Sequence, residues 1–379
     1  MFDKMMRREF WRQFDYWLFG SVVILCIFGI AMIRSAIAGN QVLAELVTRQ
    51  SIYVVLGLVV ILVTAVIDYH YWASVSRVMY IGTIAFLVIV FIVGEVQFGS
   101  ARRLDTGLFF IQPSEIAKIV LVLVLADFFA KRQQQTHNLS WLFRSFLTTM
   151  GIVVWILLQP NLSTSIVMMV LWFSLLWISG LPLKHLLLFA GIALVLGMIF
   201  GGLVISGVKL PFIADYQVAR IVNFLFPDPN ARHGDTYNVE QALITIGSGG
   251  WFGQGYGHSS QVQLRFLKVR HTDFIYAAMA SEFGFVGTTI ITGLLIFVIL
   301  RCLRAARIAA DPFGALIAYG IATVLFFQTA VNIGVNLNLI PVTGLTLPFV
   351  SYGGSSLLSL VLGIGLVESV VARHKLYEA

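Results

Sequence analysis

Hydrophobic residues occur along almost the whole chain in long continuous runs, which are separated by short stretches rich in charged residues, proline and glycine. Many windows of about 15 to 20 residues carry no charge, and this is the length that a helix needs to cross roughly 30 Å of hydrocarbon. A membrane β-barrel would show short segments of alternating hydrophobic and polar positions instead. The continuous runs therefore predict a bundle of membrane-spanning α-helices.

The breaks between these runs predict about ten transmembrane helices. The expected spans are 16–33, 52–67, 78–94, 110–130, 146–158, 165–179, 185–205, 274–300, 314–337 and 357–371. The first run follows a basic segment, as in a signal peptide, but it lacks a convincing small-residue cleavage site, so we interpret it as a span. We expect an all-α polytopic membrane protein that forms a single integral membrane domain over residues 1–379.

The distribution of basic residues orients the spans. With both termini in the cytoplasm, fourteen lysines and arginines lie inside and four lie in the short outside loops, as the positive-inside rule predicts. One long extracytoplasmic loop, 206–273, then separates the seventh and eighth spans. In it, 216–226 predicts an amphipathic helix lying on the membrane, 227–235 a polar turn and 238–246 a further short helix. Six glycines follow within 247–257.

Composition supports this class. The chain is 59% hydrophobic and 11% charged, whereas an average soluble domain has roughly 25% charged residues. The net charge of +7 suits anionic membrane lipid or an anionic substrate, and no basic groove with interleaved aromatic residues points to a nucleic acid. Cys26 and Cys302 lie far apart and predict neither a disulfide framework nor a metal site.

Ionisable residues inside apolar runs are the first candidates for chemistry, because each costs about 2.5–3.5 kcal/mol at a helix centre. Glu115 and Lys118 are three residues apart and therefore share one helical face. Pro113 favours a helix start just before them, where the helix dipole stabilises a carboxylate. The pair is either an ion pair that only holds the bundle together or a pair that lines a polar cavity, in which Lys118 would suit a phosphate group.

Asp273 is the second candidate, because it stands where the long loop re-enters the membrane. Lys268, Arg270 and His271 lie just upstream. A carboxylate at the lip of a cavity is suited to act as a general base, but Asp before an apolar run is also a common helix cap. Glu282, nine residues on, needs a polar partner of its own.

Several known site types do not fit the sequence. The glycine-rich stretch lacks the Gly-Lys-Ser/Thr of a phosphate-binding loop and the spacing of a dinucleotide-binding motif. Its glycines are better explained by backbone that lies close to the membrane surface or to a bulky ligand. Neither a catalytic triad nor a His/Cys metal spacing is evident, so a reaction here needs a substrate that carries its own activation.

Seven segments resemble the SEDS family (shape, elongation, division and sporulation proteins), in family order from about residue 100 to the C-terminus. They are Gln112-Pro-Ser-Glu-Ile-Ala-Lys118, Gln159-Pro-Asn-Leu-Ser-Thr164, Tyr216-Gln-Val-Ala-Arg-Ile221, Ile246-Gly-Ser-Gly-Gly250, His271-Thr-Asp-Phe-Ile275, Asn332-Ile-Gly-Val-Asn-Leu337, and Pro341-Val-Thr-Gly344 with Leu347-Pro-Phe-Val-Ser-Tyr-Gly-Gly-Ser-Ser356. The Pro-Val-Thr-Gly form favours the elongation branch, RodA, over the division branch, FtsW.

The resemblance implies a ten-helix fold and a peptidoglycan glycosyltransferase in the bacterial cytoplasmic membrane. Its substrates would be lipid II and undecaprenyl-diphosphate-linked glycan, and its partner a class B penicillin-binding protein that cross-links the strands. Asp273 would be the essential carboxylate. The other implied site residues are Glu115, Lys118, Gln217, Arg220, Arg270, His271, Tyr352 and Ser355. No cofactor is certain, and a divalent cation (Mg or Mn) is left open.

Some alternatives stay open at this point. Arg220 either offsets diphosphate charge or anchors its helix to phospholipid headgroups, and Tyr352, Ser355 and Ser356 either line the cavity or pack between helices. The chain departs from the family pattern at Arg102-Arg-Leu-Asp105, at Asn161 with Ser163, and at Lys268-Val-Arg270, which weakens roles for these neighbours but not for Asp273. A lipid II flippase and a non-catalytic scaffold for the cross-linking enzyme are the rival functions.

Overall fold

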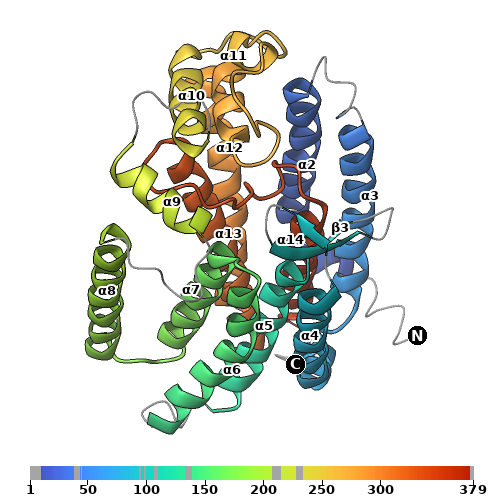
Figure 1. The fold of residues 1–379 in the computed structure, drawn as a ribbon. Coiled ribbons are helices and arrows are strands. Elements are labelled where there is room, and N and C mark those ends of the chain that lie inside the picture. Colours follow the sequence, from blue (N-terminus) through green and yellow to red (C-terminus); the bar gives the residue numbers. More distant parts are fainter. Residues whose placement is uncertain are drawn as a thin grey trace.

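The computed structural model describes residues 10–37, 43, 45–93, 95–97, 100–105, 110–132, 139–206, 215–227 and 234–375. Over these ranges the chain is mostly helical. Most of the long helices lie side by side in one bundle, whereas α8 (Leu183–Ile205) stands apart from them (Figure 1). The first basic residues of the chain, within 1–9, and most of the predicted polar turn at 227–235 lie outside the described residues.

Each predicted span coincides with one helix. These helices are α2 (Tyr16–Ala36), α3 (Glu45–Val66), α4 (Tyr69–Val93), α5 (Pro113–Ala130), α6 (Leu139–Leu158), α7 (Leu162–Ile178), α8 (Leu183–Ile205), α12 (Ile275–Ile308), α13 (Pro312–Asn336) and α14 (Gly354–Arg373). Among the described residues, seven helices are long and apolar enough to cross a membrane, namely α2, α3, α4, α6, α12, α13 and α14. The prediction of a helical, multi-pass membrane protein is confirmed, whereas the count of ten crossings stays a prediction.

A short antiparallel sheet between α4 and α5 was not predicted. Its strands are β1 (Glu95–Gln97), β2 (Ser100–Asp105) and β3 (Phe110–Ile111), in the order β1-β2-β3. Val96 pairs with Ala101, and Leu104 pairs with Ile111. Residues 110–111 therefore belong to this sheet and not to the fourth span, and α5 begins only after Gln112, at Pro113.

Helices α5, α13 and α14 form the centre of the bundle. In the most apolar window of α14, 83% of residues are buried, against 22% in α4, so α14 is surrounded by other helices and α4 lies at the periphery. Close packing here uses small residues, as is usual between membrane helices. A Cβ added at Gly320 of α13 would lie 2.9 Å from Val122 of α5, and one added at Gly363 of α14 would lie 2.8 Å from Ile321 of α13.

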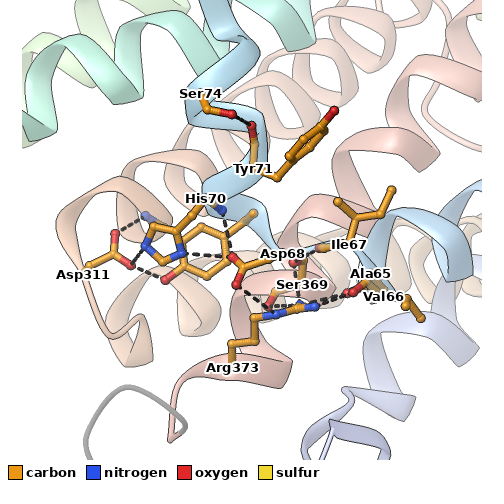
Figure 2. Close-up of polar contacts among 12 residues, drawn as sticks. Ala65, Val66, Ile67, Asp68, His70, Tyr71, Ser74, Asp311, Ser369 and Arg373 are labelled. Carbon is orange, nitrogen blue, oxygen red and sulfur yellow. Dashed lines mark hydrogen bonds and ion pairs between the residues drawn. The ribbon is translucent and has the colours of Figure 1, made fainter. Parts of the chain in front are cut away.

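A polar network closes the end of the bundle where α14 finishes (Figure 2). His70 contacts Asp68 through Nδ1 over 3.0 Å and Asp311 through Nε2 over 3.2 Å. Arg373 lies 3.7 Å from Asp68 and donates to the carbonyl of Ala65 at the end of α3 over 2.9 Å. A cation on the last carbonyls of a helix stabilises its C-terminus.

The same end of the bundle holds the beginning of α2. The amide of Asp15, which caps α2, donates to Glu368 of α14 over 3.0 Å, and the Arg373 guanidinium lies over the Phe10 ring. The described N-terminal and C-terminal helices thus begin and end on one side, as the predicted topology requires. Which side faces the cytoplasm stays a prediction from the positive-inside rule.

The segment between α8 and α12 contains three helices of its own: α9 (Asp215–Leu225), α10 (Asp235–Ser248) and α11 (Ser260–Gln263). The first two agree with the helices predicted at 216–226 and 238–246. Figure 1 shows α10 beside the upper part of α12, and α11 at the top of the molecule. This segment is therefore built over one end of the bundle.

The glycines after α10 have a more specific role than the sequence suggested. Helix α12 is broken at Gly284, whose φ is 67°, and the loop of residues 249–257, the glycine-rich loop, lies against this break. The amides of Gln254 and Gly255 donate to the carbonyls of Ser281 and Glu282, at 2.9 and 3.0 Å. A Cβ added at Gly253 would lie 2.1 Å from the Glu282 carbonyl oxygen. The close approach that the structure shows is to α12.

Candidate active site

Asp273 lies directly before α12, in a segment that is not a helix cap. The cap position is Phe274, and the start of α12 has no side-chain cap hydrogen bond. The side chain of Asp273 is only partly buried, whereas Phe274 and Ile275 are buried. Of the two interpretations left open by the sequence, the geometry therefore does not support the capping role.

Three successive main-chain carbonyls of this segment are hydrogen-bonded by other helices and loops. The His271 carbonyl accepts from the Tyr352 amide over 2.9 Å, and the Thr272 carbonyl accepts from Ser351 Oγ over 2.8 Å. The Asp273 carbonyl accepts from Nδ2 of both Asn332 and Asn336, at 3.1 and 2.9 Å. Consecutive backbone contacts of this kind fix the direction in which the Asp273 side chain leaves the chain.

The loop after α13 passes beside the Asp273 carboxylate. Gly344 has a φ of 78°, and a Cβ added there would lie 3.9 Å from Asp273 Oδ2. Asn332 Nδ2 also donates to the Leu345 carbonyl over 2.8 Å. The same asparagine thus holds both the Asp273 segment and the loop that borders it.

Glu115 and Lys118 form a buried ion pair near the start of α5. Lys118 Nζ lies 2.8 Å from Glu115 Oε2, and the Lys118 side chain is fully buried. The residue before the helix, Gln112, donates its amide to Ser355 Oγ of α14 over 3.0 Å. Asn161, the cap of α7, lies 3.4 Å from Ser114 Oγ through Nδ2. The beginnings of α5, α7 and α14 therefore meet at one place.

The loop from 337 to 353 connects this place with Asp273. Ser163 of α7 donates to the Thr343 carbonyl, next to Gly344. Farther along, Thr346 Oγ1 lies 3.0 Å from Ser356 Oγ of α14. The loop therefore contacts α7, α14 and the Asp273 segment, and the candidate residues on α5, α12 and α14 lie at the same end of the bundle. Both Ser355 and Ser356 make inter-segment polar contacts, as expected of either alternative left open above.

Helix α9 is attached to the bundle at the turn between α6 and α7. Tyr216 Oη and Gln217 Nε2 both donate to the Pro160 carbonyl, over 2.6 and 2.8 Å. Arg220 lies above the Tyr216 ring and pairs with Asp235 of α10, Nε to Oδ2, over 3.0 Å. Arg220 and Asp235 line a cavity of about 250 Å³ between α9, α10 and residues 338–342. The cation predicted for diphosphate binding is thus already paired with a carboxylate.

Arg270 and His271 lie between the long loop and the bundle. The buried Arg270 side chain donates through Nε to the Ala36 carbonyl at the end of α2, and through Nη1 to the Leu267 carbonyl over 3.2 Å. Burial, and then the charge of Arg270, lower the pKa of His271. The His271 ring lies 6.1 Å from the Tyr352 ring, centroid to centroid. Arg270 therefore holds the loop against α2, and its assignment to diphosphate binding stays a prediction.

Sequence reasoning did not assign a role to Asn332, Asn336 or Ser35. The two asparagines stand four residues apart in an apolar helix, so their shared face was a readable signal. Ser35 of α2 donates to Glu282, which is buried, and is the polar partner that Glu282 was expected to need. No sequence signal connects these two residues, because 247 positions separate them.

Residues 11–376 match the FtsW/RodA/SpoVE family of cell cycle proteins. The chain belongs to this family. Its relatives include FtsW of Geobacter metallireducens, described as a probable peptidoglycan glycosyltransferase, with 32% identity over 382 residues and 96% of each chain covered. Stage V sporulation protein E of Bacillus subtilis is 35% identical over 337 residues, with 87% of each chain covered.

FtsW of Alteromonas naphthalenivorans is 34% identical over 325 residues, which are 84% of this chain and 60% of the relative. Solved structures of the FtsW/RodA/SpoVE family agree with the fold. Thermus thermophilus RodA has a TM-score of 0.67 at 29% identity, covering 96% of this chain and 97% of RodA. A chain from a peptidoglycan synthase complex that coordinates polymerization and crosslinking has a TM-score of 0.79 at 29% identity, covering 95% and 98%.

Proposed function

We propose that this protein is a peptidoglycan glycosyltransferase that polymerises lipid II into glycan strands at the outer face of the bacterial cytoplasmic membrane. The supporting observation is the fixed Asp273 segment at one end of a membrane bundle, in a family whose named members include peptidoglycan glycosyltransferases. A substrate linked to undecaprenyl diphosphate brings its own leaving group, so no nucleotide site is needed.

Asp273 acts as the general base in this proposal. Its carboxylate takes the proton of the acceptor sugar hydroxyl, and that oxygen forms a bond to the anomeric carbon of the growing chain. The bond between this carbon and the diphosphate breaks, and undecaprenyl diphosphate leaves with the electron pair. One carboxylate suffices for a single inverting displacement, because the leaving group is already an anion.

Cations near the site offset the charge of the diphosphate. Lys118 is paired with Glu115 and Arg220 with Asp235, so each would bind a phosphate by exchanging its present partner. Gln217, His271, Tyr352 and Ser355 complete the proposed substrate contacts. Among the described residues, no group of three or more His, Cys, Asp or Glu side chains is placed to hold a metal ion, and the proposed steps use none.

A class B penicillin-binding protein is the proposed partner, in line with the similarity to a chain of a peptidoglycan synthase complex. We assign the protein to cell elongation because of the Pro341-Val-Thr-Gly344 motif. The relatives named above include FtsW and a sporulation protein. Complementation of bacterial strains that lack the elongation or the division protein therefore tests the assignment to elongation. Rescue of rod shape supports elongation, whereas rescue of septation alone refutes it.

Purified protein in detergent tests the activity. Wild type given lipid II should lengthen glycan strands, and Asp273→Asn should not, while both give the same size-exclusion profile and melting temperature. A folded Asp273→Asn variant with full polymerase activity would overturn the role of this residue. A flippase would move lipid II across vesicle membranes without lengthening glycan in detergent, and a scaffold would bind its partner without either activity.

A further inference from the structure

The glycine-rich loop presents two large apolar side chains outward. Trp251 is 68% exposed and Phe252 is 80% exposed. Adjacent exposed aromatic residues are unusual on a surface that faces only water, and contiguous apolar patches mark sites of protein or membrane contact. These two rings are therefore the feature that the proposed function does not explain.

Backbone hydrogen bonds hold the rings in place. At the break at Gly284, nearby peptide groups lack the hydrogen bonds of a continuous helix, and they bond to the glycine-rich loop instead. The Phe285 amide donates to the Gly250 carbonyl over 2.8 Å, and the Val286 amide donates to the Trp251 carbonyl over 3.0 Å. Since Gln254 and Gly255 bind the other side of the break, the loop is fixed to α12 on both sides of Trp251 and Phe252.

The rings continue the exposed face of α12. The Trp251 and Phe285 rings meet edge to face with centroids 5.3 Å apart. From Phe285 downward, the large exposed apolar side chains of α12 share one broad face of the helix: Phe285, Val286, Ile290, Ile296 and Leu300. From 285 to 300 this face extends about 22 Å along the helix. Because α12 is long and apolar enough to span the membrane, the rings stand at the upper end of a lipid-facing stripe.

We infer that Trp251 and Phe252 insert into the adjacent membrane leaflet and anchor the glycine-rich loop at its interface. Aromatic side chains are enriched at this depth, where apolar and polar surroundings meet. The patch is continuous with the lipid-facing surface of a spanning helix, and this continuity identifies lipid as its occupant. The inference concerns membrane contact and is independent of the reaction proposed above.

Site-specific fluorescence tests the inference on the full chain. In a background with Cys26→Ala and Cys302→Ala, Phe252→Cys is labelled with the environment-sensitive dye NBD. Ser260→Cys is the control, because Ser260 is also exposed but begins α11 and is not part of the apolar stripe on α12. Both proteins are reconstituted into vesicles of phosphatidylethanolamine and phosphatidylglycerol, with and without doxyl-labelled lipid.

At position 252 we expect blue-shifted emission, strong quenching by doxyl lipid and little quenching by aqueous iodide. At position 260 we expect the reverse. A label at 252 that iodide quenches as readily as at 260 would refute the membrane contact. Shielding at 252 from both quenchers would also refute it, since protein would then cover the patch. Trp251→Cys provides a second labelled position if Phe252→Cys is poorly folded.

Discussion

The Asn336 side chain donates a hydrogen bond to the main-chain carbonyl of Asp273 over 2.9 Å, while its own Oδ1 accepts from the Ala277 amide over 3.1 Å. One fully buried amide thus binds the chain on both sides of the α12 start. It connects the residue proposed to act as base with the end of α13, so the position of Asp273 depends on the packing of these two helices.

Asn336→Leu should lower both stability and polymerase activity. The substitution leaves the Ala277 amide unpaired in the protein interior, and each buried unsatisfied group of this kind costs about 1–3 kcal/mol. Thermal unfolding and glycan synthesis by the purified variant measure the two effects. Thr289→Ala on α12 serves as control, because Thr289 is exposed and surface changes usually stay within about 0.5 kcal/mol. Wild-type melting and wild-type rate in Asn336→Leu would contradict the assigned role.

Removing one member of the Glu115–Lys118 pair should destabilise the protein more than removing both. Lys118→Met leaves the buried Glu115 carboxylate without its cation, and breaking a buried pair in this way costs about 3–5 kcal/mol. The double variant Glu115→Gln/Lys118→Met should recover most of that loss, because neither charge remains. A double-mutant cycle of thermal unfolding in one detergent measures the coupling; strictly additive effects would show that the pair does not interact.

Gly284→Ala should destabilise the break in α12. Gly284 has a φ of 67°, and an added Cβ would lie 2.3 Å from the Gly253 amide nitrogen, so strain of about 1–3 kcal/mol adds to a steric clash. The matched control is Gly293→Ala on the same helix, where no atom lies within 4 Å of an added Cβ. There we expect a neutral or stabilising effect of up to about 1 kcal/mol. Equal melting temperatures for the two variants would contradict this account.

The protein should become less stable as the pH is lowered, because His271 takes up a proton more readily in the unfolded state. Burial and Arg270 lower the pKa of His271 in the folded protein below its ordinary value of 6.5. Above that value both folded and unfolded states hold a neutral ring, so the group contributes nothing. Below it the unfolded state takes up the proton first, so the free energy of unfolding decreases until the folded-state pKa is reached. Melting temperatures from about pH 8 to about pH 5 should vary less in His271→Gln than in His185→Gln, whose exposed ring serves as control.

The bundle was predictable because the thickness of the membrane fixes the length of an apolar run. The span predicted at 314–337 agrees with α13, Pro312–Asn336. Errors arose where a helix continues past the hydrocarbon: the span predicted at 52–67 begins at Glu45 in the structure, since polar residues extend the helix without extending the apolar run. The membrane thickness does not constrain the length of the strands in the short sheet at 95–111, and this sheet was not predicted.

Contacts in the candidate site were predictable only where both partners lie close together in the sequence. Glu115 and Lys118 share one helix, and their three-residue spacing placed them together. Arg270 contacts Ala36, which is 234 positions away, and Arg220 meets Asp235 of another helix. Whether an arginine faces a phosphate, a carbonyl or a carboxylate depends on such contacts between distant segments, and local sequence does not specify them.

The placement of both members of the buried ion pair on α5 has a consequence for biogenesis. Because Glu115 and Lys118 are one helical turn apart, each can neutralise the other as soon as this helix has formed, before any neighbouring helix has arrived. A lone lysine at membrane depth would oppose insertion by about 2.5–3.5 kcal/mol. The nascent segment therefore carries its own counter-charge into the lipid, and its delivery to the bilayer does not have to wait for the rest of the protein to assemble.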